Sequence, residues 1–131
     1  MERWLPVFER RAAADPVTTF AARVDRHFAG YASMHCLSPG KDGGKAPDGW
    51  YLTGLVIAPE WRRHGIGAAL TRHRLKVLAE ITSEVYYFAN ALNQPTIDLH
   101  AKLGFQELTT DFQVPGVIFS GGTGHLFRLA L

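Results

Sequence analysis

The stretch LVIAPEWRRHGIGA, residues 55–68, joins the most apolar run of the sequence to its clearest helical pattern. Residues 50–57 are mainly apolar, which predicts a central strand buried on both faces, ended by Pro59. From about residue 65 to 81, apolar and charged side chains fall on opposite sides of a helix, which predicts an amphipathic helix packed on the sheet. Its apolar side holds Ile66, Leu70, Val77 and Ile81.

Two glycines, Gly65 and Gly67, stand where this helix begins. They let backbone N–H groups point outward together at the positive end of the helix dipole, which favours a phosphate or pyrophosphate. The third glycine of the dinucleotide fingerprint would fall at Leu70, and no Gly-Lys-Ser/Thr of a P-loop follows. A Gly-x-Gly at a helix start also serves as a turn or packing device, but Arg62 and Arg63 just before it favour an anionic ligand.

The rest of the chain alternates strand and helix patterns. We expect a short opening helix over residues 4–13, stopped at Asp15-Pro16, because a residue before proline is pushed out of the helical region. The further elements that we expect are two strands over 18–37 turning near 25–27, a loop over 38–49, a strand over 85–89, a helix over 95–103 capped by Gly104, and strands over 107–114 and 125–131. This order predicts an α/β or α+β layered domain with a mixed sheet.

Composition limits the class of protein. The 131 residues, 47% hydrophobic and 20% charged, match one soluble globular domain spanning residues 1–131. A net charge of +2 without a basic block argues against nucleic acid or membrane as the main partner. No window holds the roughly 20 apolar residues that a membrane helix needs. Cys36 is the single cysteine, so we expect no intrachain disulfide, no thiolate metal site and a cytoplasmic setting.

A second informative stretch, NQPTIDLHAKLGF, lies at residues 93–105, and both its order and its spacing from the first stretch matter. Together the two stretches resemble the GNAT superfamily of acyl-CoA-dependent N-acetyltransferases: a strand–loop–helix with Arg-x-x-Gly-x-Gly, then an Asn and a helix ending in Lys-Leu-Gly-Phe. The resemblance implies one acetyltransferase domain with a mixed, mostly antiparallel sheet, splayed central strands and flanking helices. It also implies acetyl-CoA as cosubstrate and no metal.

The resemblance also implies the residues that bind the cofactor. The backbone of the strand around Leu55 and Ile57 would bond the pantetheine arm, and the loop amides, with the basic side chains before them, would hold the phosphates. Asn93 would reach the pantetheine, although Asn is also a favoured helix N-cap and both roles stay open. The implied cofactor-binding set is Leu55, Val56, Ile57, Arg62, Arg63, His64, Gly65, Ile66, Gly67, Ala68 and Asn93.

His100 stands where the family usually carries a tyrosine that protonates the departing CoA thiolate. An imidazole has a reference pKa of about 6.5, so an appreciable cationic fraction near neutrality could supply that proton. The resemblance therefore implies a catalytic His100. The alternative is a helix-surface histidine that moves no proton.

The remaining polar candidates are weaker. We expect His73 and Cys36 to be packing residues, and the Gly-rich residues 121–124 to form a hairpin loop bordering the acceptor pocket. Tyr51, Thr53 and Asp111 are positional guesses for a general base, and water could do that work, so no base is assigned.

We therefore expect an acetyl-CoA-dependent N-acetyltransferase acting on a primary amine. A small-molecule acceptor is favoured because no tail or acidic groove for a protein substrate is readable from the sequence. A protein N-terminus or lysine is the rival acceptor. The alternative class is an acyl-CoA-binding regulatory module, motivated by the missing tyrosine and by a short N-terminal region. A homodimer that completes the acceptor site stays open.

Overall fold

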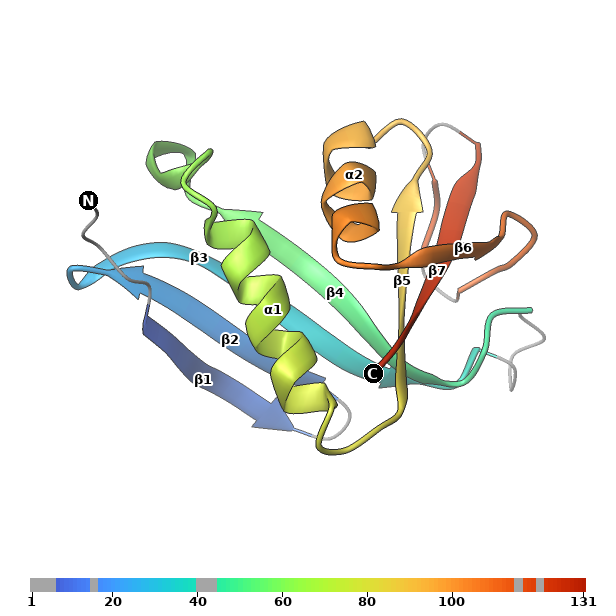
Figure 1. Cartoon of the computed structure of the whole chain (residues 1–131), viewed down its shortest axis with the longest axis horizontal. Coiled ribbons are helices and arrows are strands. Elements are labelled where there is room, and N and C mark those ends of the chain that lie inside the picture. Colours follow the sequence, from blue (N-terminus) through green and yellow to red (C-terminus); the bar gives the residue numbers. More distant parts are fainter. Residues whose placement is uncertain (1–6, 15–16, 40–44, 115–116, 120–121) are drawn as a thin grey trace.

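The computed structural model describes residues 7–14, 17–39, 45–114, 117–119 and 122–131. Within these ranges seven strands form one sheet in the order β1-β2-β3-β4-β5-β7-β6, with two α-helices against it (Figure 1). The elements are β1 (Val7–Ala14), β2 (Val17–Val24), β3 (His27–Leu37), β4 (Gly49–Ile57), the short 3-10 helix η2 (Pro59–Trp61), α1 (Ile66–Leu78), β5 (Glu84–Asn90), α2 (Gln94–Lys102), β6 (Gln106–Thr109) and β7 (Gly124–Ala130). Of the neighbouring pairs, β4 and β5 run parallel and the others antiparallel, so the expected mixed, mostly antiparallel sheet is confirmed.

The N-terminal segment is a strand, and the predicted opening helix is wrong. Strand β1 pairs antiparallel with β2, from Val7 opposite Arg23 to Ala14 opposite Val17. Helix propensity differs by less than about 1 kcal/mol per residue among ordinary side chains, so the free edge of β2, which offers a row of hydrogen-bonding partners, can override it. The predicted helix also drew on residues 4, 5, 15 and 16, which lie outside the described ranges.

The predicted hairpin over residues 18–37 is confirmed. Strands β2 and β3 are joined by Asp25 and Arg26, whose φ angles of 49° and 70° are those of a two-residue turn that matches the twist of the strands. The expected strands at 50–57, 85–89 and 125–131 are also present, as β4, β5 and β7. Of the loops predicted around them, residues 40–44, 115–116 and 120–121 lie outside the described ranges.

Helix α1 packs its buried row on strands β2, β3 and β4. The row follows i+4 spacing and contains an arginine, since Ile66, Leu70, Arg74 and Leu78 are all buried. The apolar side predicted from the sequence is therefore displaced around the helix. Ile81, counted on that side, lies beyond the end of α1 and is 57% exposed.

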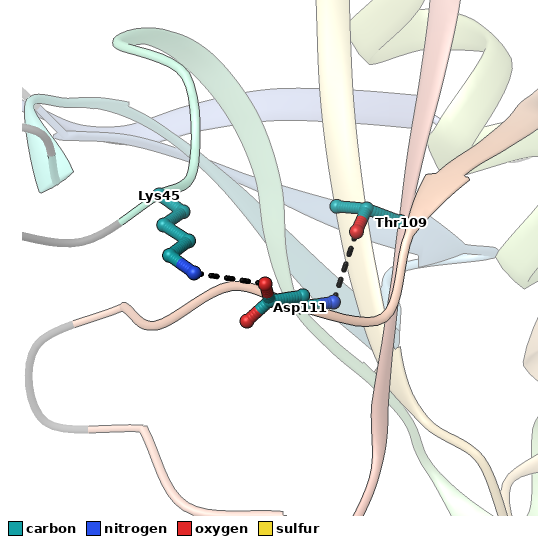
Figure 2. Close-up of polar contacts among 3 residues, drawn as sticks. All are labelled: Lys45, Thr109 and Asp111. Carbon is teal, nitrogen blue, oxygen red and sulfur yellow. Dashed lines mark hydrogen bonds and ion pairs between the residues drawn. The ribbon is translucent and has the colours of Figure 1, made fainter.

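The sheet is buried on both faces where β5 crosses it. Side chains alternate along a strand, so Val85, Tyr87 and Ala89 join the larger core beneath α1, and Tyr86 joins a second core on the opposite face. The second core also receives Phe112 and Val114. The sequence predicted a strand as far as Val114, but β6 ends at Thr109, whose Oγ1 accepts a hydrogen bond from the backbone N–H of Asp111 (Figure 2).

The two central strands separate, which creates the space for a site. Strands β4 and β5 pair only at Tyr51 opposite Tyr86 and Leu52 opposite Tyr87, and beyond these pairs they diverge (Figure 1). At the same level β4 contains a bulge: Thr53 lies opposite Ser33, Leu55 lies opposite Ala32, and Gly54 between them has a φ of 49°. The splayed strands expected from the sequence are thus confirmed.

Candidate active site

Two cavities with shared lining residues adjoin the end of β4. The larger, of about 970 Å³, lies between the end of β4 and the start of α1. The smaller, of about 450 Å³, lies between β4 and β5 and reaches residues 117–119. Leu55, Asn93 and Thr96 line both cavities, so a long ligand can pass from one to the other at these residues.

The start of α1 forms one wall of the larger cavity. Arg63 and Gly65 have positive φ angles of 65° and 77°, and the first hydrogen bond of the helix runs from the N–H of Ala69 to Gly65 O. The N–H groups of residues 66–68 therefore precede the helical ladder at the positive end of its dipole. This arrangement suits a phosphate or pyrophosphate, as the sequence predicted.

Nine of the eleven predicted cofactor-binding residues line the larger cavity: Leu55, Val56, Ile57, Arg62, Arg63, Gly65, Ile66, Gly67 and Asn93. Ala68 and His64 are not among its lining residues. The Nδ1 of His64 instead donates a hydrogen bond to Arg62 O at 2.8 Å, and its ring lies 5.4 Å from that of Trp61. Arg62 is itself tethered, because its Nε donates to Ile57 O at 3.3 Å.

Asn93 occupies the N-cap position of α2, but its side chain makes no capping hydrogen bond. Of the two roles that the sequence left open, the cap is therefore not realised. Because Asn93 lines both cavities, its amide stands where a ligand passing between them would meet it.

We expect Asn93→Ala to leave stability unchanged and to weaken acetyl-CoA binding about three- to tenfold, the effect of one lost hydrogen bond. Replacing a functioning Asn cap by Ala would cost about 1 kcal/mol, which a melting experiment detects. Asn93→Asp is the second variant. It should also weaken acetyl-CoA binding, because a carboxylate cannot donate a hydrogen bond as the amide does. A large fall in melting temperature with unchanged affinity would contradict the prediction.

His100 is buried, with 2% of its surface exposed, so the surface-histidine alternative is wrong. Its Nδ1 lies 2.8 Å from Thr96 O, and because a carbonyl only accepts, Nδ1 carries the hydrogen and donates it. The ring stacks on Tyr87 with centroids 3.6 Å apart. His100 lines the smaller cavity, and its Nε2 is buried with no partner among the described residues.

The protonation state expected for His100 must be corrected. Burial lowers the pKa of the imidazole to about 4, and the nearby charge of Arg74 acts in the same direction. At pH 7 only about one molecule in a thousand then carries the cation. In the neutral ring Nδ1 holds the hydrogen, so Nε2 offers a lone pair and has no proton to give.

We expect the buried His100 to make the protein less stable in acid. The unfolded chain has the ordinary pKa of about 6.5, so below pH 6.5 the unfolded state binds more protons than the folded state and stability falls until the folded pKa of about 4 is passed. Above pH 6.5 this stability is fully present. Between pH 7 and pH 5 the loss amounts to about 2 kcal/mol. Urea unfolding of wild type and His100→Gln at both pH values measures it, and an equal pH dependence of the two proteins would contradict the assignment.

Arg74 was missed by sequence reasoning, which treats a basic residue on an amphipathic helix as solvated. It is 1% exposed and lines the smaller cavity. Its Nη1 donates to Ser33 O at 2.8 Å and to Thr53 O at 3.1 Å, the carbonyls of the pair that precedes the bulge. Its Nη2 donates to Thr71 Oγ1 at 3.0 Å.

Burial lowers the pKa of the Arg74 guanidinium to about 10, so it remains cationic at neutral pH. The i+4 position of Arg74 between Leu70 and Leu78 is the signal that could have found it.

Tyr87 and Thr96 were also missed. The Tyr87 hydroxyl lies 2.6 Å from Thr96 Oγ1, and both residues line the smaller cavity. Burial is the main cause that raises the pKa of Tyr87. In the sequence, Tyr87 belongs to an apolar strand and Thr96 to the first turn of a helix. Only the packing of α2 on β5 brings them together.

The three positional guesses for a general base have other roles. Asp111 is exposed, lines neither cavity and pairs with Lys45 at 2.9 Å (Figure 2). Tyr51 donates its hydroxyl hydrogen to Pro47 O at 2.6 Å, and burial raises its pKa above the ordinary range. Thr53 lines the smaller cavity, and its hydroxyl lies 2.7 Å from His35 Nδ1. His73 packs its ring edge-on to Phe20, as expected of a packing residue.

Comparison with known proteins decides the family. Residues 1–105 match the sequence model of the Acetyltransferase (GNAT) family. The chain belongs to the GNAT family. The predicted resemblance is thus confirmed, and the splayed part of β4, the bulge and the helix start described above lie within the matched residues.

The proteins that resemble this chain include different acetyltransferases. An N-alpha-acetyltransferase of Sulfurisphaera tokodaii is 35% identical over 60 residues, which cover 44% of this chain and 36% of the relative. NAA60 of Arabidopsis thaliana, solved with acetyl-CoA, has a TM-score of 0.66 and 21% identity over 90% of this chain and 78% of its own. PaiA N-acetyltransferase of Thermoplasma acidophilum, solved with coenzyme A, has a TM-score of 0.67 and 16% identity over 88% of this chain and 62% of its own.

No helix in the described ranges is long and apolar enough to cross a membrane.

Proposed function

We propose that the protein transfers an acetyl group from acetyl-CoA to a primary amine. The observation that supports the proposal is the pair of adjoining cavities, with a helix start suited to a phosphate at one end and buried polar side chains at the other. The loop before α1 would hold the pyrophosphate, and the free edge of β4 would meet the pantetheine arm. The acetyl group would then lie near Thr96, where the cavities join, and next to His100 of the smaller cavity.

The chemistry requires a neutral amine whose nitrogen attacks the thioester carbon. A C–N bond forms, the C–S bond breaks, the sulfur gains a proton and the nitrogen loses one. The neutral imidazole of His100 cannot give a proton from Nε2, but its buried lone pair can accept a hydrogen bond from the attacking N–H. We therefore assign His100 the role of orienting the amine.

We expect His100→Ala and His100→Phe to lower kcat at least about tenfold and to leave acetyl-CoA affinity within a few-fold. The phenylalanine variant keeps a ring against Tyr87 and removes only the ring nitrogens. Because the pKa of His100 is about 4, its titration should cause no loss of kcat between pH 6 and 8. Single-turnover rates are the measurement. Wild-type rates in both variants would leave His100 a packing residue.

The acceptor end of the smaller cavity favours an apolar amine. Phe88, Val117 and Phe119 line it, and among its described lining residues none is an aspartate or glutamate. A polyamine would find no carboxylate there, whereas an aromatic or aliphatic amine would find apolar contacts. We propose a small-molecule amine of this kind. The N-terminus of a protein is the second candidate, because the relative from Sulfurisphaera tokodaii is an N-alpha-acetyltransferase.

An acceptor panel tests the proposed function. Acetyl-CoA is mixed with the protein and with apolar amines, spermidine, peptides with free N-termini, or peptides whose only amine is lysine, and CoA release is followed. Turnover with apolar amines supports the proposal, and turnover confined to peptide N-termini selects the second candidate. Tight acetyl-CoA binding without turnover on any acceptor would contradict the proposed transferase and favour the alternative, an acyl-CoA-binding regulatory module.

A further inference from the structure

Thr96 stands at the junction of the two cavities and contacts two aromatic side chains. Its Oγ1 lies 2.6 Å from the Tyr87 hydroxyl, and its carbonyl accepts the hydrogen of His100 Nδ1. Tyr87 is buried, and its ring stacks on His100 with an interplanar angle of 3°. The three residues therefore fix one another on facing elements, β5 and α2.

The hydrogen bond between the two hydroxyls has a preferred direction. By geometry either hydroxyl can donate, and the greater acidity of a phenol over an aliphatic alcohol favours Tyr87 as the donor and Thr96 Oγ1 as the acceptor. The hydrogen of the Thr96 hydroxyl is then not used in this bond and can be donated to another acceptor. Because Thr96 lines both cavities, a ligand that passes between them passes this residue.

Among the described residues, the pair is the best-placed proton source for a sulfur at the junction. His100 Nε2 carries a lone pair, and Asn93, which lines the same junction, has an amide that does not ionise. Arg74 also lines the smaller cavity, but its guanidinium remains charged when hydrogen-bonded to two carbonyls and a hydroxyl. It would favour a thiolate by charge without giving up its proton.

We propose that Thr96 and Tyr87 form a hydroxyl relay that protonates the departing CoA sulfur, an inference that rests on the proposed acetyl transfer. As the C–S bond breaks, the sulfur takes the hydrogen of Thr96 Oγ1, and Thr96 takes the hydrogen of Tyr87. The Tyr87 phenolate is then reprotonated by the proton that the acceptor nitrogen loses, carried by water. A tyrosine of strand β5 thus performs the task for which α2 offers only a histidine.

Titration of the thiol of bound CoA tests the relay without an acceptor. The thiolate absorbs short-wavelength ultraviolet light more strongly than the thiol does, and a hydroxyl that donates to it lowers the thiol pKa. With wild type, bound CoA should titrate at least about one pH unit below its value in Thr96→Val and in Tyr87→Phe. Thr96→Ser, which restores the hydroxyl, should titrate as wild type. Tyr86→Phe is the matched control, because Tyr86 lies on the opposite face of β5 and lines neither cavity.

Single-turnover acetyl transfer gives the second measurement. Thr96→Val and Tyr87→Phe should each slow transfer at least about tenfold with acetyl-CoA affinity within a few-fold, and Thr96→Ser should recover most of the rate. An unchanged thiol pKa in Thr96→Val would overturn the relay. A thiol pKa lowered in wild type and raised in both variants, without acetylation of any amine, would support the hydroxyl pair and reject the proposed transferase function.

Discussion

We expect Gly67→Asp to abolish acetyl-CoA binding while the protein still folds. A Cβ at residue 67 would lie 3.6 Å from Leu55 Cδ2 and 3.9 Å from Ile57 Cγ1, in ordinary contact, so the variant is not excluded by its own packing. The carboxylate would enter the larger cavity, where two unit charges about 4 Å apart repel by about 4 kcal/mol at an effective dielectric of 20. We therefore expect at least about a hundredfold loss of affinity.

The folded state of Gly67→Asp should not suffer, since an acidic side chain in the first turn of a helix interacts favourably with the dipole. Acetyl-CoA at a hundred times its Kd stabilises wild type by about 2.7 kcal/mol, which raises its melting temperature. The variant should show no such rise. Gly67→Ala is the control for added size, and it should bind within a few-fold of wild type. A normal rise with Gly67→Asp would move the phosphate site away from this loop.

Arg74→Met should destabilise the protein by about 3 kcal/mol. Methionine fills a similar volume, but it leaves the carbonyls of Ser33 and Thr53 without the charged donor that they share. Hydrogen bonds to charged groups contribute about 1.5–3 kcal/mol each, and removing one partner leaves the other buried and unpaired. Urea unfolding measures the loss.

Lys76→Met is the matched control, because Lys76 lies exposed on the same helix and should change stability by less than about 0.5 kcal/mol. Arg74→Lys, which keeps the charge but has a single nitrogen, should fall between wild type and Arg74→Met. Wild-type stability in Arg74→Met would mean that the bulge at Gly54 holds without this side chain.

The parts of the fold that were predictable from sequence are those with local signals. The junction over residues 55–68 carries a proline, two glycines and a change from apolar run to helical period, and the turn at Asp25 and Arg26 lies between two alternating segments. The opening helix failed because β1 exists through its pairing with β2, a partner that no local pattern reveals.

The site was predictable only in part, for a related reason. Backbone features, such as the helix start at Gly65, follow from the motif. Side-chain states follow from packing. His100 is neutral because α2 buries it on Tyr87, and Arg74 points inward because it donates hydrogen bonds to the carbonyls of Ser33 and Thr53. The Tyr87–Thr96 pair joins β5 to α2, so the sequence of neither element alone predicts it.

The short join between β4 and β5 leaves an edge of β4 that behaves as an unfilled position in the sheet. From Thr53 onward, the β5-facing edge of β4 has no strand partner in the described ranges. An extended molecule with amide groups, such as the pantetheine arm, can pair with such an edge as an added peptide strand would. Recognition of this kind reads the main chain and not the side chains. Leu55 and Ile57 are constrained by their packing on the core and by their place in the cavity wall, whereas a main-chain pairing with a ligand would not depend on which side chains they carry.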